Sequence, residues 1–192
     1  MKKFAIAVAV ASALCLPSFA SATVIDFNGG QDPFFTYNSV GFIGLVQANS
    51  GYDKMYSFNG GGMAAFNPGG VAFASFTKAS AGTFNLNSLL VDGAWGTQTL
   101  TFVGLASGST LYSTTFGVST NPAKLNLNWN GINELRVLTG NDFVHNNTLN
   151  GWGQHWVIDN ITVNQVPEPA PLALMGLGIV GLLASRKKFA AK

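Results

Sequence analysis

Cysteine and charge are both scarce in this sequence. Its 192 residues include one cysteine, Cys15, and 9% charged residues. Cys15 lies in an N-terminal segment that we expect to be removed, so the remaining chain cannot form an intramolecular disulfide. The stability of the folded domain must therefore come from its hydrophobic core.

Recognisable catalytic motifs are also missing. The sequence has no Gly-x-Ser-x-Gly, His-Glu-x-x-His, Cys-x-x-Cys or phosphate-binding loop. The two histidines, His145 and His155, could form a metal pair or an acid/base couple, but such isolated loop histidines are more often solvated turn residues. A glycosidase needs two carboxylates about 5 to 9 Å apart, and nothing in the sequence pairs the candidates Asp92, Glu134, Asp142 and Asp159. We expect no enzymatic activity.

The N-terminus has the three parts of a cleavable signal peptide. Residues 1–3 are basic, residues 4–16 are almost entirely apolar, and Ala20-Ser21-Ala22 is a small-residue cleavage site. A lipoprotein signal at Cys15 is the alternative, but a leucine precedes it where a small residue is expected. We predict a signal peptide over residues 1–22 and an exported mature chain.

The composition changes again at the C-terminus. Pro167-Glu168-Pro169 is followed by the uncharged stretch 170–184 and by Arg186-Lys187-Lys188. The stretch is shorter than the ~20 residues of a comfortable membrane span, so it predicts a short transmembrane helix. The basic cluster favours a cytoplasmic C-terminus, which leaves the domain outside the cytoplasm.

This tail, residues 167–192, resembles the sorting signal of PEP-CTERM proteins. The resemblance implies recognition and processing by an exosortase-type membrane enzyme in a Gram-negative bacterium that makes exopolysaccharide. The chain would then pass through the inner membrane transiently and reach the cell surface or extracellular matrix. An unprocessed single-pass anchor is the alternative. Gly176-x-Gly178-x-x-Gly181 matches a dinucleotide-binding spacing, but no strand precedes it.

Between the two terminal segments the chain is mildly acidic. Residues 23–166 carry four basic against seven acidic side chains, a net charge of −3. Nucleic-acid affinity comes mainly from neutralising phosphates with a basic surface. This part of the chain has no basic stripe, which excludes a nucleic-acid partner.

The same segment has the pattern of short antiparallel strands. Leu125 to Trp129 alternates apolar and polar residues, as does Leu135 to Val137, and residues 97–105 and 110–118 are rich in Thr, Phe, Leu and Val. Turn residues separate these runs, among them Gly108, Asn121-Pro122 and Asn130-Gly131. We predict an all-β domain over residues 23–166, an antiparallel β-sandwich or jelly roll of about eight strands.

Residues 83–163 are also similar to ectodomains that often precede this kind of tail. The similarity rests on Trp129-x-Gly131-Ile132-x-Glu134-Leu135 and on Trp156 to Val163. Those ectodomains look like carbohydrate-binding jelly rolls, which implies a non-enzymatic domain associated with exopolysaccharide or matrix. A structural or adhesive protein without a sugar site, or a glycoside-acting hydrolase, are the alternatives.

The four tryptophans divide into two groups. Trp129 and Trp156 lie in alternating strand segments, where large aromatics usually fill the core. Trp95, in Gly93-Ala94-Trp95-Gly96, and Trp152, in Gly151-Trp152-Gly153, lie in glycine-rich turns, and a ring displayed there could stack on a sugar with little loss of rotamer entropy. Alternatively, each ring folds back to close an open end of the sandwich.

Asp159 interrupts an apolar strand. If Val157, Ile161 and Val163 face inward, the period of two places Asp159 inward as well. A buried carboxylate needs a partner: a backbone turn, Arg136, or a Ca²⁺ ion shared with Asp26, since hard cations prefer oxygen ligands.

Overall fold

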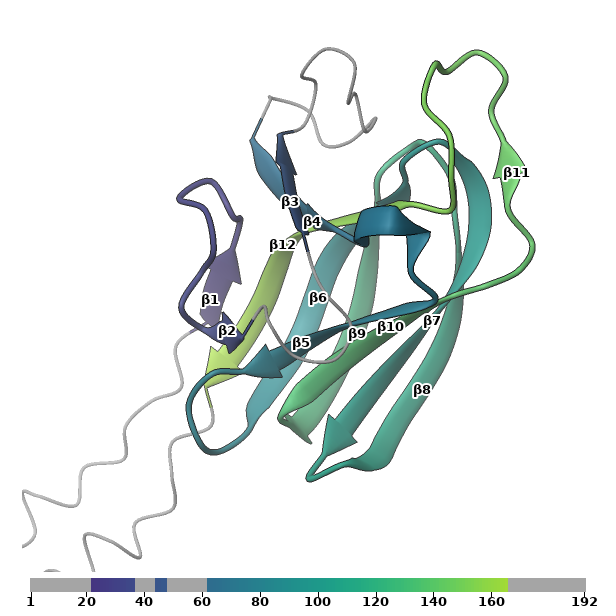
Figure 1. Cartoon of the computed structure of the whole chain (residues 1–192). Coiled ribbons are helices and arrows are strands. Elements are labelled where there is room, and N and C mark those ends of the chain that lie inside the picture. The colour runs from purple at the N-terminus through teal and green to yellow at the C-terminus, as the bar shows by residue number, and fades with distance from the viewer. Residues whose placement is uncertain (1–21, 37–43, 48–61, 166–192) are drawn as a thin grey trace, which may run out of the picture. The chain divides into compact units, whose positions relative to one another are not determined.

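Twelve β-strands in two antiparallel sheets form the part of the chain that the computed structural model describes, residues 22–36, 44–47 and 62–165 (Figure 1). The first sheet has the order β3 (Gly44–Gln47), β4 (Met63–Phe66), β12 (Trp156–Gln165), β6 (Phe84–Gly93), β9 (Ala123–Ile132), and β1 (Ala22–Ile25) also pairs with β12. The second has the order β11 (Val144–His145), β7 (Gly96–Ala106), β10 (Glu134–Thr139), β5 (Phe73–Lys78), β2 (Phe35–Thr36), and β8 (Ser109–Val118) also pairs with β7.

The predicted fold class is confirmed. Every pairing is antiparallel, and the only helical turn among the described residues is the 3-10 turn η2 (Pro68–Gly70). The strands outnumber the expected eight because β1, β2, β3, β4 and β11 are only two to four residues long. Such short strands give too few alternating residues to be recognised in a sequence.

The two sheets pack face to face around one apolar core. Phe84 and Leu86 of β6 contribute to it from the first sheet, and Leu100 and Phe102 of β7 from the second. Trp129 and Trp156 belong to the same core, which confirms their predicted position. Burying each of the larger side chains contributes about 1.5 to 3 kcal/mol, and these contributions hold the sandwich together without a disulfide.

The predicted turns hold with one exception. Gly108 lies between β7 and β8, and Asn121-Pro122 lies between β8 and β9. Asn130-Gly131, however, lies inside β9, where Gly131 has a φ of 72° and the pairing with β6 shifts its register. The chain turns instead at Asn133, whose backbone N–H donates to the carbonyl oxygen of Leu105.

The described residues belong to one compact unit, Ser21–Val166. The predicted signal peptide and the predicted tail helix lie outside the described residues, apart from Ala22 at the start of β1. Within the described part of the chain, no helix is long and apolar enough to span a membrane.

Candidate functional site

The segment between β10 and β12, residues 140–155, extends away from the two sheets and carries β11 (Figure 1). It is fixed at its start by Asp142, whose carboxylate accepts hydrogen bonds from the backbone N–H and the hydroxyl of Thr99. These two bonds hold the pKa of Asp142 below its usual value. The backbone N–H of Asn146 then donates to the carbonyl oxygen of Trp95. The segment is therefore tied to β7 and to the turn between β6 and β7.

Trp152 is the most exposed large apolar side chain among the described residues, at 72% exposed. Its ring centroid lies 4.4 Å from that of His145 and 6.3 Å from that of Phe143, the latter edge to face. The Nε2 of His145 donates to the carbonyl oxygen of Gly151 at 2.7 Å, which fixes the imidazole beside the indole. The indole of Trp152 is therefore held by His145 and Phe143 while most of its surface faces solvent.

Trp95 is buried instead, with 7% of its surface exposed. Its ring lies directly against Gly151, where an added Cβ would overlap the indole. It belongs to a second apolar cluster with Ala64, Ala94 and Val157, against which Leu149 packs. The prediction of a displayed ring is wrong for Trp95, because the residue 140–155 segment folds over it. The position of Trp95 corresponds to the alternative stated above, in which the ring folds back and closes an open end of the sandwich.

Asp92 lies beside this second cluster and has no polar partner. It pairs with Val157 across β6 and β12 and is completely buried. Neither carboxylate oxygen makes a hydrogen bond, and burial raises its pKa to about 9. At neutral pH the side chain is therefore protonated. Sequence reasoning named Asp92 only as one of four candidate carboxylates and did not predict its burial, although a single acid within the apolar run 89–95 was the available signal.

The sequence predicted that Asp159 shares a face of the strand with Ile161 and Val163, and this prediction is wrong. Asn160 has a φ of 47°, and the pairing of β12 with β6 shifts between Asp159 and Thr162. This β-bulge inverts the alternation. Ile161 and Val163 therefore enter the core between the sheets, whereas Asp159 and Val157 lie on the opposite face of the first sheet.

Of the three partners predicted for Asp159, the structure contains the backbone turn and not Arg136. Its carboxylate accepts a hydrogen bond from the backbone N–H of Asn160 at 2.7 Å, which corresponds to the backbone-turn alternative. Burial and the nearby charge of Asp26 raise its pKa to about 6. Arg136 binds Glu134 instead.

A calcium ion would relieve the repulsion between Asp26 and Asp159, but the pair offers few ligands. Ca²⁺ takes six to eight oxygens, and both oxygens of Asp26 already accept hydrogen bonds from Asn28. Within the described residues, no group of three or more His, Cys, Asp or Glu side chains could hold a metal ion. The calcium site stays a prediction.

The other candidate catalytic residues are held separately. Glu134 accepts hydrogen bonds from Ser75 and Arg136, while Asp142 binds Thr99. The histidines are not simply solvated: His155 donates from Nδ1 to the carbonyl oxygen of Asn67, and His145 supports Trp152.

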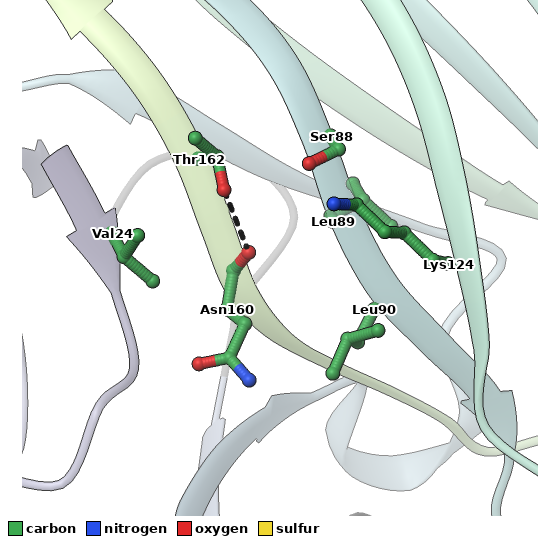
Figure 2. Close-up of a pocket in the computed structure, with 7 residues that line it drawn as sticks. All are labelled: Val24, Ser88, Leu89, Leu90, Lys124, Asn160 and Thr162. Atoms are coloured by element: carbon green, nitrogen blue, oxygen red, sulfur yellow. Dashed lines mark hydrogen bonds between the residues drawn. The ribbon is translucent and has the colours of Figure 1, made fainter. Parts of the chain in front are cut away.

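A cavity of about 230 Å³ lies on the face of the first sheet that is turned away from the core. Figure 2 shows that it is bounded by Val24 of β1, by β6 and β12, and by Lys124 of β9. Ser88, Leu90, Asn160 and Thr162 also line it. Neither Lys124 nor Asn160 was singled out from the sequence, since an exposed lysine and an Asn in a strand carry no recognisable motif.

Comparison with known proteins identifies the tail. Residues 165–188 match the PEP-CTERM protein-sorting motif. The match includes Pro167, Glu168 and Pro169 as well as Arg186, Lys187 and Lys188, which confirms the predicted resemblance. No curated protein matches the sequence of this chain.

Solved structures with a similar course of the chain include carbohydrate-binding modules. A family 29 carbohydrate-binding module is 18% identical, covers 77% of this chain and 90% of its own, and has a TM-score of 0.46. The CBM22-1 and GH10 modules of the Clostridium thermocellum endo-1,4-beta-D-xylanase 10B, complexed with xylohexaose, are 13% identical and cover 75% of this chain and 28% of their own, with a TM-score of 0.44.

Proposed function

We propose that this protein is exported, sorted through its PEP-CTERM tail, and associated as a non-enzymatic β-sandwich domain with extracellular polysaccharide. The sorting motif at residues 165–188 supports processing by an exosortase-type enzyme in the inner membrane. The predicted signal peptide supports export by the same route. The protein is then displayed on the cell surface or in the extracellular matrix of a Gram-negative bacterium.

The exposed ring of Trp152 carries the glycan part of this proposal. An aromatic ring offers a large contact area with only two side-chain torsions to fix, so binding costs little conformational entropy. Here the packing of Trp152 against His145 and Phe143 limits its motion before any ligand binds. Asn147, Thr148 and Asn150 are exposed in the same segment and can hydrogen-bond sugar hydroxyls beside the ring.

Polysaccharide affinity electrophoresis of the purified full chain tests the proposal. Trp152→Ala should lose most of the mobility shift caused by the retained glycan, whereas Leu111→Ala should keep it. Leu111 is a suitable control because it is 50% exposed, on the distant strand β8. Equal retardation of the two variants and the wild type would show that Trp152 is not the glycan contact.

A structural or adhesive role without a sugar site is the second candidate, and β8 favours it. Among the described strands β8 pairs only with β7, and its ten residues contain neither charge nor proline. Charges and prolines are the usual protection of an exposed edge strand against pairing with another chain. A full chain that forms concentration-dependent assemblies and is retarded by no polysaccharide would favour this role.

A hydrolase is the weakest alternative. Three of the candidate carboxylates are held apart: Glu134 binds Arg136, Asp142 binds Thr99, and Asp92 is buried without a partner. Asp159 lies near Asp26, but both oxygens of Asp26 accept hydrogen bonds from Asn28. Glycoside hydrolysis requires two carboxylates facing each other across the scissile bond. We therefore expect no release of reducing sugar from the polysaccharides that the chain binds.

A further inference from the structure

The cavity on the outer face of the first sheet exists because of the bulge at Asn160. On one side of the bulge Asp159 pairs with Leu90 of β6, and on the other Thr162 pairs with Ser88. The shift between these pairs interrupts the ladder of β12 and β6, since a bulge leaves its extra residue unpaired. The space that opens between the strands is the cavity of about 230 Å³.

Polar groups without partners line this cavity. The side-chain amide of Asn160 projects between Val24 and Leu90 (Figure 2). The hydrogen bonds of Asn160 within the described residues involve its backbone and not its side-chain amide, and the side chains of Ser88 and Lys124 form none there. Thr162 donates to the backbone carbonyl oxygen of Asn160 over 3.5 Å, which is at the limit of a hydrogen bond. The cavity therefore offers donors and acceptors that only a ligand or water can satisfy.

Lys124 gives the cavity its charge. Lys124 is exposed, and Arg136 and Glu134 form the one salt bridge among the described residues, so Lys124 has no carboxylate partner there. No acidic side chain lines the cavity. Asp92 lies two residues beyond Leu90, the partner of Lys124 across β6 and β9, and burial raises its pKa to about 9, so it carries no charge near neutrality. Asp159 pairs with Leu90 from the other side; with its pKa raised to about 6 it is mostly ionised near neutrality, and its carboxylate accepts a hydrogen bond from the backbone N–H of Asn160. A negatively charged group is the natural partner of this ammonium.

The size and the apolar walls of the cavity point to a small saturated ring. Ligand pockets for whole drug-sized molecules occupy about 300 to 1,000 Å³, so this volume suits a single sugar unit. Val24 and Leu90 offer aliphatic surface to the C–H groups of such a ring, while Asn160 and Ser88 face its hydroxyls (Figure 2).

We propose that this cavity is a second binding site, which takes one acidic sugar residue of a polysaccharide with its anionic group against Lys124. The inference rests on the polysaccharide association proposed above, and adds to it a preference for acidic chains. A carboxylate and a sulfate ester share the required chemistry. The net charge of −3 on residues 23–166 does not oppose this contact, because charges beyond about 8 Å are largely screened at physiological salt.

Binding of oligosaccharides to the full chain in detergent, measured by isothermal titration, tests this site. The probes are oligogalacturonate, its fully methyl-esterified neutral form, and a sulfated galactan oligosaccharide. Comparison of the affinities for the carboxylated and the sulfated probe shows which anion the site binds. Lys124→Met keeps the aliphatic stem and removes the charge, Lys124→Arg restores the charge, and Asn160→Gly removes the amide while tolerating the positive φ.

Lys78→Met is the charge control, since it removes one positive charge from β5 of the second sheet. It also removes the hydrogen bonds of Lys78 to Ser80 and to the carbonyl oxygen of Ala81, so its melting temperature is measured beside its binding. We expect Lys124→Met to bind at least one acidic probe about tenfold more weakly, as the loss of a charge-assisted hydrogen bond implies. Lys124→Arg should recover binding, Asn160→Gly should bind the same probe more weakly, and Lys78→Met should match the wild type.

The outcomes separate this inference from the proposed function. Acidic probes bound equally by Lys124→Met and Lys78→Met, or a neutral form bound as well as the acidic ones, would overturn the acidic-sugar site while leaving Trp152 as the glycan contact. A wild-type chain that binds none of the probes and is retarded by no polysaccharide would overturn the proposed function itself.

Discussion

Asp92 illustrates how a single side chain can act against the stability of this domain. A carboxyl group with no hydrogen bond inside an apolar cluster is charged only at a large desolvation cost. In the folded protein its pKa is about 9, compared with 3.8 for the unperturbed group. Between these values the folded state holds a proton that the unfolded state has lost. Stability therefore falls as the pH rises through this range, by about 1.4 kcal/mol per pH unit.

Asp92→Asn tests this pH dependence. The amide has nearly the same shape and no charge, so the variant should melt at a higher temperature than the wild type at pH 8 and at a similar temperature at pH 4. Asp159, whose pKa is raised to about 6, adds a slope of the same sign between pH 4 and 6 in both proteins. Melting curves from pH 4 to 8 measure the difference, and parallel pH profiles would contradict it.

Trp95 and Trp152 show why residue-scale predictions from sequence are incomplete. Both lie in glycine-rich turns, and the sequence offers no reason to distinguish them. The structure distinguishes them because the chain around Gly151 passes over Trp95, whose ring excludes any Cβ at that position. The next residue, Trp152, contacts only His145 and Phe143 among the ring contacts of the described residues and leaves 72% of its surface exposed.

At the scale of elements, the bulge at Asn160 decides most of the chemistry of the first sheet. A regular β12 would have kept Asp159 on the same face as Ile161 and Val163, which is the core face. One residue with positive φ instead sends the carboxylate to the outer face and opens the cavity beside Lys124. Asparagine is among the residues that adopt this conformation most readily, but its sequence context reads as an ordinary strand.

Calcium binding is the prediction that belongs to this scale, since Asp26 follows β1 and Asp159 lies in β12. A shared ion would link the first and last strands and add RT ln(1 + [L]/Kd) to the stability. With only two carboxylates we expect binding no tighter than the about 10⁻⁴ to 10⁻³ M of extracellular sites. In 10 mM calcium the melting temperature of the wild type should rise, whereas that of Asp159→Asn should not change. Identical melting curves of the wild type in calcium and in chelator would show that no calcium ion is bound.

At the scale of the whole molecule, the sorting tail is the feature with the clearest consequence. Each proline of Pro167-Glu168-Pro169 fixes its own φ near −65° and favours an extended residue before it. We expect this rigidity to display Glu168 to the processing enzyme at the membrane surface. The uncharged stretch and Arg186-Lys187-Lys188 would hold the chain in the inner membrane meanwhile.

Replacing Pro167-Glu168-Pro169 by three alanines should block processing and leave export intact. The variant should accumulate in the inner membrane at its full anchored mass, because its apolar stretch and basic cluster are unchanged. Deletion of residues 167–192 is the control and should release a soluble periplasmic domain. Cell fractionation with intact-mass measurement compares the wild type, the triple-alanine variant and the deletion variant. A triple-alanine protein that is processed like the wild type would show that the tail acts only as an anchor.

The sequence by itself determined the features that depend on local order along the chain. The sorting motif is a linear string, so Pro167 to Lys188 identified it directly. The alternation in β9 and β10 predicted antiparallel strands, and the placement of Trp129 and Trp156 in such strands predicted the core, because strand faces repeat with a period of two. These predictions needed no knowledge of which strands are neighbours.

Only the tertiary structure decided the features that depend on what lies across from a residue. The carboxyl group of Asp92 has no hydrogen-bond partner because apolar residues from β12 and from the turn after β6 lie around it. Trp95 is covered at Gly151, which is 56 residues away in sequence. Lys124, Asn160 and Val24 meet at one cavity because β9, β12 and β1 belong to the same sheet. Burial and the electrostatic environment are set by such long-range contacts, which local sequence patterns do not encode.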